Sequence, residues 1–263
     1  MTPQEPFAEG LENAVTRIRD MLPDTLIGLF SDQSGISRES FQHIASPYTG
    51  KVAAVDGSHG ILCDGGHFSI GIIRAAASVF QGGRRSRLRA TPLQLVMIGP
   101  GRENTDFSEI YQESFHRPPH KPLINEDPLQ TCGVLRETFE YAVAFLLAHE
   151  LSAGDILIMD GALRVSHAAL FPILQEIQEI CGRRDVLLAA VTKKTSATWG
   201  KGHPLLPAVG GIAAQYGIGG RWYLNIPRDI LDSTLSNEFY QGEIYVGKLS
   251  PDASRVFKVE LPA

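Results

Sequence analysis

The stretch "KVAAVDGSHG", residues 51–60, decides how the rest of the chain is interpreted. An apolar run ends there on Asp56, and a glycine follows at once. The same pattern returns in "GDILIMDGALR", residues 154–164, where an apolar run leads into Asp160 and a second glycine. Asp-Gly is a common turn dipeptide, so either acid alone indicates only a turn. Two apolar runs that both close on this dipeptide favour instead two buried strands, each carrying a carboxylate to one edge of a sheet.

The composition is that of a folded protein with a sizeable core. Hydrophobic residues make up 43% of the 263 residues, charged residues make up 20%, and the formal net charge is -5. The longest uninterrupted apolar run, residues 141–148, is far shorter than the roughly 20 residues of a membrane-spanning helix. The N-terminal residues lack the basic and apolar regions of a secretory signal. We therefore expect a cytoplasmic protein with no membrane segment.

The three cysteines, Cys63, Cys132 and Cys181, are odd in number and widely separated. No two of them have the short spacing of a zinc site or a redox motif, which argues against structural zinc and against a disulfide framework. We expect three ordinary buried thiols.

Hydrophobic periodicity predicts a helix followed by a series of strands in the first part of the chain. Apolar residues at helical spacing indicate a helix over residues 11–22, and polar, turn-rich sequence follows. Gly-rich or basic turns then separate three strand-like runs. These runs cover residues 51–56, 67–80 and 93–99.

The second half of the sequence alternates helical and strand-like segments. A long surface loop is expected over residues 199–220, because that segment is dense in glycine and proline. The other expected elements are helices over residues 107–114, 130–151 and 167–181, strands over residues 155–160 and 185–192, and a final pair of strands over residues 242–261.

This order of elements matches a ribonuclease H-like layout. Three antiparallel strands come first and parallel strands follow, with helices between them. We therefore predict an α/β fold with a ribonuclease H-like mixed sheet flanked by helices and preceded by an N-terminal helix. The predicted division is an N-terminal extension, residues 1–48, and one domain, residues 49–263.

In such a sheet the first and fourth strands are neighbours, so Asp56 and Asp160 should emerge together at the C-terminal ends of their strands. Two unpaired acids held close together repel each other, and a divalent cation relieves that repulsion. Carboxylate oxygens suit Mg²⁺ or Mn²⁺, and these ions in turn suit phosphodiester substrates. The residues alone leave two interpretations open, which are a metal site and two ordinary turns.

A third acid is expected from the helix between these two strands. Glu137 and Glu140 are three residues apart and share one helix face. Glu140 lies closer to the apolar face, so we favour it as the metal ligand and keep Glu137 in reserve. A solvated glutamate is the alternative for either position.

One basic segment stands out in an otherwise acidic chain. The segment "GGRRSRLR", residues 82–89, carries Arg84, Arg85 and Arg87. The net negative charge argues against nonspecific coating of nucleic acid but is compatible with a local basic groove. The segment is either a nucleic-acid contact or a solvated turn between strands.

Five short blocks of sequence together resemble one known family. From residue 51 onward the chain is similar to the NurA family of DNA-repair nucleases. No single block is specific, and the resemblance depends on all five occurring in order. The blocks are "VAAVDGS" (52–58), "LRETFE" (135–140), "ILIMDGAL" (156–163), "AVTKKTS" (190–196) and "YVGKLSPDASRVFKVELP" (245–262).

The resemblance implies a ribonuclease H-like nuclease that degrades DNA ends with Mn²⁺ or Mg²⁺, forms a homodimer and works with HerA, a hexameric DNA-pumping ATPase. It implies that Asp56, Glu140 and Asp160 hold the metal. The family's lysine after the fifth strand falls on Lys193, where a cation could bind the scissile phosphate. Lys194 is adjacent and is a further nucleic-acid contact.

Two departures from the family pattern keep other functions open. Ala162 replaces the usual serine after the second Asp-Gly, and the chain ends without the helical segment that supplies a last ligand. His167 and His203 are possible substitutes for that ligand. The alternatives to a DNA nuclease are a catalytically inactive adaptor that docks on the ATPase and a related nuclease that acts on RNA–DNA hybrids.

Overall fold

The structure is a computed structural model. It describes residues 8–10, 12, 13, 24–44, 48–99, 101–125, 127–193, 195, 197–200, 202–231 and 242–262. Most of the helix predicted over residues 11–22, and also Lys194, lie outside these residues. The chain forms two compact units. Unit 1 comprises residues 1–45, 193–237 and 244–258, and unit 2 comprises residues 46–192, 238–243 and 259–263.

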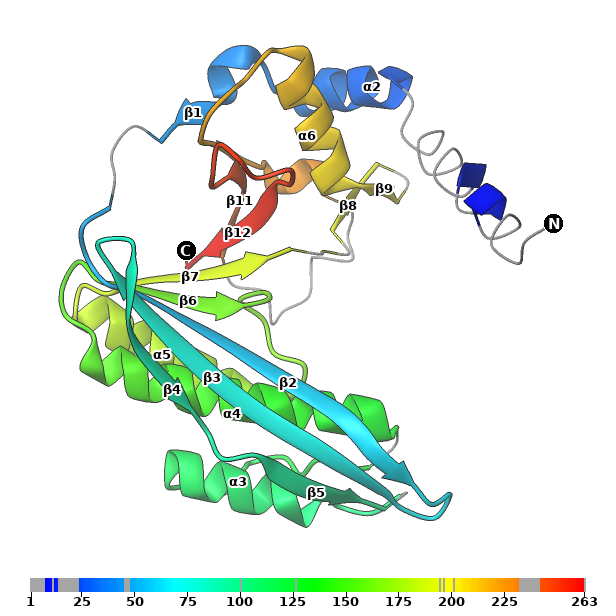
Figure 1. Cartoon of the computed structure of the whole chain (residues 1–263), viewed down its shortest axis with the longest axis vertical. Helices are drawn as coiled ribbons and strands as arrows, with labels where there is room; N and C mark the ends of the chain where they lie inside the picture. Colours follow the sequence, from blue (N-terminus) through cyan, green and yellow to red (C-terminus); the bar gives the residue numbers. More distant parts are fainter. Residues whose placement is uncertain are drawn as a thin grey trace. The chain divides into compact units, whose positions relative to one another are not determined.

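In the described chain a run of consecutive strands fills much of the first half, and helices and strands are interspersed in the second half (Figure 1). The α-helices are α2 (Asp24–Ser34), α3 (Thr105–Phe115), α4 (Pro128–Glu150), α5 (Phe171–Arg183) and α6 (Leu205–Gln215), and the short 3₁₀ helices are η1 (Arg38–Ser40), η2 (Ala168–Leu170) and η3 (Arg228–Ile230). The strands are β1 (Gln42–His43), β2 (Val52–Asp64), β3 (Ser69–Gln81), β4 (Arg84–Ala90), β5 (Gln94–Ile98), β6 (Ile156–Asp160), β7 (Leu187–Thr192), β8 (Thr198–Trp199), β9 (His203–Pro204), β10 (Trp222–Asn225), β11 (Glu243–Lys248) and β12 (Phe257–Leu261).

Unit 2 is built on a mixed sheet, as predicted. Its strand order is β7-β6-β2-β3-β4, and β5 also pairs with β3. The pairs β2–β3, β3–β4 and β3–β5 are antiparallel, whereas β2–β6 and β6–β7 are parallel. The β2–β3 hairpin turns at the sequence Asp64-Gly65-Gly66, where the Gly66 amide donates a hydrogen bond to the side chain of Asp64.

Most of the basic segment is a strand, so the interpretation of the whole segment as a turn is wrong. Gly82 and Gly83 both have positive φ, of 56° and 74°, and they make the tight connection from β3. The arginines then fall on β4, which pairs with β3 from Gln81 opposite Arg84 to Ala76 opposite Ala90. The turn is therefore confined to the two glycines, for which this backbone conformation carries no steric penalty.

Helix α4 covers one face of the unit 2 sheet and supplies much of its core. It packs along β2 and β3, and α3 and α5 pack against it (Figure 1). The helix begins where the sequence favours it, because Asp127 accepts a hydrogen bond from the Gln130 amide and Pro128 occupies the first turn. Gly71 of β3 allows close approach, since a β-carbon there would lie 2.2 Å from the sulfur of Cys132. All three helices predicted for this part of the chain are confirmed.

Unit 1 contains two helices that the sequence analysis missed. Helix α2 lies in the segment expected to be turn-rich, and α6 lies in the expected surface loop. The two helices contact each other, and a β-carbon at Gly211 would lie 2.5 Å from Ile27. The glycines of α6 therefore allow close helix packing. The face of α6 that is buried consists of Leu205, Ala208, Val209, Ile212 and Ala213.

Unit 1 also contains a small antiparallel sheet, β1-β10-β11. Beneath it lies an aromatic cluster in which Phe41 packs edge-on against Trp222, with ring centroids 5.1 Å apart. The final pair of strands predicted from the sequence is confirmed as β11 and β12.

The cysteines are all free thiols, but they are not all buried. Cys132 and Cys181 are in the core of unit 2, whereas Cys63 is exposed near the end of β2. The expectation of three buried thiols is therefore wrong for Cys63. Across the described residues, no helix is long and apolar enough to cross a membrane.

Candidate functional site

Asp56 and Asp160 occupy corresponding positions on neighbouring strands. Strand β2 pairs with β6 in parallel, and the register runs from Val52 opposite Ile156 to Val55 opposite Met159. Asp56 and Asp160 are the next residues on each strand. Neighbouring strands lie about 4.8 Å apart, a spacing that the two cations of a two-metal site, about 3.5–4 Å apart, could bridge.

The two aspartates differ in how their strands continue. Asp160 is the last residue of β6, and Gly161 follows with a positive φ of 100°. Asp56 was expected at a strand end, but β2 runs on to Asp64, and Asp56 pairs with Ala76 of β3. The Asp-Gly sequence at residue 56 is therefore strand interior, and the turn interpretation is wrong for it.

Both aspartates project from the face of the sheet opposite α4. Side chains alternate between the two faces of a strand. Val55 and Met159 are buried in the core that the helices share with the sheet. Asp56 and Asp160, one position further along, are exposed on the other face. The two carboxylates thus lie side by side and within reach of solvent.

Glu140 approaches β2 from the side of α4. Its side chain is only 8% exposed. A β-carbon at Gly57 would lie 2.5 Å from Glu140 Oε1 and 2.8 Å from Arg136 Cγ. The missing side chain of Gly57 is therefore what lets this carboxylate rest against the backbone of β2, one residue after Asp56.

Burial raises the pKa of Glu140 to about 7, and the negative charges of Glu137, Asp160 and Asp56 act in the same direction. The guanidinium of Arg136 opposes this shift, because its Nη1 donates a 2.5 Å hydrogen bond to Oε1. Glu140 is therefore within electrostatic reach of both aspartates. Its carboxyl group carries a proton more readily than an ordinary glutamate does.

The hydrogen-bond donors of Arg136 are only partly satisfied. It is one turn before Glu140 on α4, and its Nε is buried without a hydrogen-bond partner among the described residues. Within the same part of the chain, no three His, Cys, Asp or Glu side chains are close enough to hold a metal ion. This agrees with the geometry, since Glu140 lies on the helix side of β2 and the two aspartates lie on the other side.

The reserve acid, Glu137, is bound to the loop that follows β6. It accepts hydrogen bonds from the backbone amide and the hydroxyl of Ser166, and its amide contact is 3.1 Å. Burial raises its pKa, while the hydrogen bonds from Ser166 oppose that shift. Glu137 therefore fixes the 161–166 loop against α4.

The sequence analysis missed a buried acid on the last strand. Glu260 of β12 is fully buried and accepts a 2.7 Å hydrogen bond from the Leu163 amide. Its charge contributes to raising the pKa of Tyr141, which neighbours Glu140 on α4. Glu260 thus anchors the segment just after Asp160. The alternation in "FKVEL" gave no signal of this, because it indicates that the valine and leucine face the core.

Neither histidine proposed as a substitute ligand is placed with these acids. His167 Nδ1 accepts a hydrogen bond from the Ala169 amide at the start of η2, and its ring packs edge-on against Phe107. Burial lowers the pKa of His167. His203 belongs to unit 1, where its ring packs against Trp199.

The basic residues fall into two groups. On β4, Arg87 forms an ion pair with Glu150 at 2.9 Å, as Arg89 does at 2.8 Å. Arg84 and Arg85 are exposed, with no ion pair among the described residues. Lys193 directly follows β7, belongs to unit 1 and lines a cavity there.

The donor set suits a hard divalent cation. Asp56, Glu140 and Asp160 offer only carboxylate oxygens, the ligand type that Mg²⁺ and Mn²⁺ prefer. The mutual repulsion that helps to raise the pKa of Glu140 is what a cation would relieve. Arg136 now supplies that positive charge on the helix side.

A Gly57→Ala substitution is expected to disturb this site more than the same change elsewhere on the strand. The new methyl group would collide with Glu140 and Arg136, so we expect a loss of about 1–3 kcal/mol in the free energy of unfolding. Gly60→Ala is the matched control, because its nearest neighbour, Ile72, would be 4.0 Å away. Denaturant titration of both variants measures the difference. Equal stability of the two would contradict the close packing of Glu140.

Together these features define a mixed α/β protein with a ribonuclease H-like sheet that carries acids on its central strands. No family model and no curated protein matches the sequence. Among solved structures, the fold is NurA-like. The NurA nuclease from Sulfolobus solfataricus matches 98% of this chain and 81% of its own with a TM-score of 0.53 and 12% identity.

Two further NurA structures agree with this comparison. One matches 97% of this chain and 86% of its own, with a TM-score of 0.55 and 10% identity. The other, NurA bound to dAMP and manganese, matches 95% and 86%, with a TM-score of 0.54 and 10% identity. The fold expected from the order of the sequence elements is therefore confirmed.

Proposed function

We propose that the protein is a nuclease that hydrolyses phosphodiester bonds of DNA. The observation that carries this proposal is the arrangement of three acids around one point of the sheet. Asp56 and Asp160 are in register on adjacent strands, and the buried Glu140 rests against Gly57 with its pKa raised by both. Perturbed acids of this kind are typical of catalytic centres. The NurA-like fold supports the same conclusion.

The cofactor we propose is Mn²⁺ or Mg²⁺, held by the adjacent carboxylates of Asp56 and Asp160; for Glu140 to join them as a third ligand, its side chain must leave its place on the helix side of β2. Support comes from the all-oxygen donor set and from the similar NurA structure that contains manganese. When bound, such an ion supplies an activated water and offsets charge on the phosphate. The chain's own contribution is to hold the two aspartates in register and to keep Glu140 in a buried setting, where its protonation responds to nearby charge.

Positive charge for the DNA backbone is proposed to come from Lys193 and from β4. Arg84 and Arg85 are the better candidates on β4, because Glu150 already neutralises Arg87. We keep Arg87 and Lys194 as further contacts. Each phosphate contact releases counterions and so makes binding dependent on salt.

Replacing Arg84 and Arg85 with alanine is expected to weaken binding of duplex DNA. The slope of log K against log salt concentration should become shallower by about 0.9 for each lost phosphate contact. Arg183→Ala serves as the control, since Arg183 is an exposed arginine of α5 that the proposal does not use. Fluorescence anisotropy across a salt series measures both effects. An unchanged slope in the double variant would remove β4 from the proposed DNA interface.

The remaining proposals concern partners and location. We propose that the protein is a cytoplasmic homodimer that works with a HerA-type hexameric ATPase, as its sequence resemblance implies. Size-exclusion chromatography with light scattering, with and without such an ATPase, tests both the dimer and the assembly.

One observation favours a second candidate, which is a catalytically inactive adaptor. Arg136 already forms an ion pair with Glu140, as expected if that acid no longer binds a cation. Release of nucleotides from linear DNA by the purified protein, with Mn²⁺ or with EDTA, separates the two candidates. The nuclease proposal requires release that depends on Mn²⁺, whereas an adaptor gives none even when the ATPase is added. An RNA–DNA hybrid in the same assay identifies a preference for RNA strands.

A further inference from the structure

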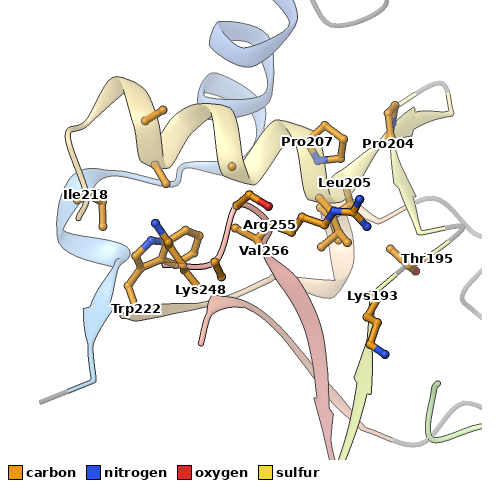
Figure 2. A pocket seen from close by; sticks show the side chains of 16 residues that line it. Lys193, Thr195, Pro204, Leu205, Pro207, Ile218, Trp222, Lys248, Arg255 and Val256 are labelled. Carbon is orange, nitrogen blue, oxygen red and sulfur yellow. The ribbon is translucent and has the colours of Figure 1, made fainter. Parts of the chain in front are cut away.

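Unit 1 contains a cavity that shares only Lys193 with the proposed cleavage site. Its volume is about 660 Å³, within the range of small-molecule sites. Its walls come mainly from the length of α6, the end of β11 and the turn that precedes β12. Figure 2 shows Arg255 extending toward Leu205, and Pro207 at the start of α6. The cavity lies entirely within unit 1.

Three cations surround this cavity without any acid. Lys193, Lys248 and Arg255 line it, and none of its lining residues is an aspartate or glutamate. Within the described chain, none of the three cations forms an ion pair. Three uncompensated positive charges around one concave site favour an anionic ligand.

The start of α6 adds a further feature that favours an anion. Its first residue, Leu205, donates its amide to Ala197, and Pro207 has no amide hydrogen. Leu206 therefore carries the remaining amide of the first turn, and no side chain caps this end of the helix. The positive end of the helix dipole thus faces the same cavity as the three cations.

The rest of the wall is apolar. Leu206 and Val256 are partly exposed side chains that line the cavity, and Pro207 is exposed beside them. A bare anion would leave the apolar wall in water, and an apolar molecule would leave the cations without a counter-charge. A ligand with a phosphate and a flat, weakly polar body satisfies both.

We propose that this cavity binds a nucleotide, with its phosphate held by cations from the set Lys193, Lys248 and Arg255 and its base against the Leu206, Pro207 and Val256 wall. The choice of a nucleotide over other phosphorylated molecules rests on the proposed nuclease function. The nucleotide is either free or the terminal residue of a DNA strand. The two sources share the same chemistry and differ only in what is attached to the sugar.

Calorimetric titration in EDTA tests the proposal without any cleavage. The probes are AMP, dAMP, inorganic phosphate and a short single-stranded oligonucleotide with or without a 5′ phosphate. AMP, or the 5′-phosphorylated oligonucleotide, is expected to bind with a Kd below about 1 mM. Binding of the mononucleotides identifies a free nucleotide, and binding of the oligonucleotide alone identifies a strand end. If neither binds, or if inorganic phosphate binds as tightly as AMP, the proposal is wrong.

Matched variants test whether nucleotide binding depends on the cations of the cavity or on positive surface charge in general. The double variant Lys248→Ala/Arg255→Ala is expected to weaken nucleotide binding at least about tenfold, while Arg38→Ala, which removes a cation of η1 outside the cavity, leaves it unchanged. Equal losses in the two would overturn the proposal. Asp160→Asn should abolish cleavage yet bind the nucleotide normally, so a failure of the nuclease proposal is distinguished from a failure of this one.

Discussion

Replacing Asp56 with asparagine is expected to lower the rate of DNA cleavage by about a hundredfold to a thousandfold while leaving the fold intact. Asparagine keeps the shape of the side chain but removes the negative charge that the proposed cation needs. Losses of about 10²–10³ are typical when one preorganised electrostatic group is removed from an active site. Asp56 is exposed on β2, so the change should not disturb the core.

The matched control is Asp185→Asn. Asp185 is an exposed aspartate outside the site, with a positive φ of 54°, a conformation that asparagine adopts as readily as aspartate does. Initial rates of nucleotide release with Mn²⁺ should be normal for this variant. A cleavage rate equal to the parent's in Asp56→Asn, with circular dichroism unchanged, would show that the reaction does not depend on this carboxylate.

The second large effect is a pH dependence of the protein's stability that arises from the carboxyl group of Glu140. The folded protein raises the pKa of this carboxyl from 4.5 to about 7, so between these values the folded state holds more protons than the unfolded state. Stability therefore falls as pH rises through this window, and the penalty is complete above about pH 7. Its size is on the order of 3 kcal/mol. Glutamine, which is neutral at every pH, removes the penalty.

Glu140→Gln is thus expected to unfold at a higher temperature than the parent at pH 8, by several degrees, and at the same temperature near pH 4.5. Thermal unfolding followed by circular dichroism at both pH values measures this. Glu113→Gln, on the exposed face of α3, is the control and should show no pH-dependent difference. If Glu140→Gln is less stable at pH 8, the ion pair with Arg136 outweighs the burial of the charge.

Mn²⁺ is expected to raise the unfolding temperature of the parent more than that of Glu140→Gln. This is the reverse of the difference expected at pH 8 without the ion. A cation that binds the folded state raises the unfolding temperature by an amount that grows with the logarithm of its concentration divided by its Kd. At pH 8 the ion should therefore stabilise the parent and have little effect on Glu140→Gln, which lacks one of the three proposed carboxylates. Equal stabilisation of both proteins would remove Glu140 from the proposed ligand set.

The sequence predicted the acidic pair and its helix because each depends on a local pattern. Apolar runs that end on Asp56 and Asp160 are typical of neighbouring buried strands, and the helix between them had a clear apolar face. The sequence pattern did not predict that β2 continues beyond Asp56. Gly57 and Gly60 look like turn residues in the sequence, whereas in the structure Gly57 makes room for Glu140.

The elements that sequence reasoning missed depend on contacts between distant residues. The glycines of α6 indicated a loop, but Gly211 allows that helix to approach Ile27 of α2. The burial of Glu260 reverses the face that its strand pattern predicts, because the carboxylate binds the Leu163 amide. Propensity and periodicity describe one segment at a time, so partners of this kind leave no trace in either signal.

The division of the chain has a consequence for how the protein is made. Residues 46–192 emerge from the ribosome as one stretch, and they contain nearly all of the sheet and helices of unit 2. Unit 1 draws on three separate stretches, and β1 from the first of them must wait for β10 from the second before it can pair. Long waits of this kind slow folding and leave strand edges uncovered. The nascent chain of unit 1, rather than that of unit 2, is therefore where chaperones have the most to protect during translation.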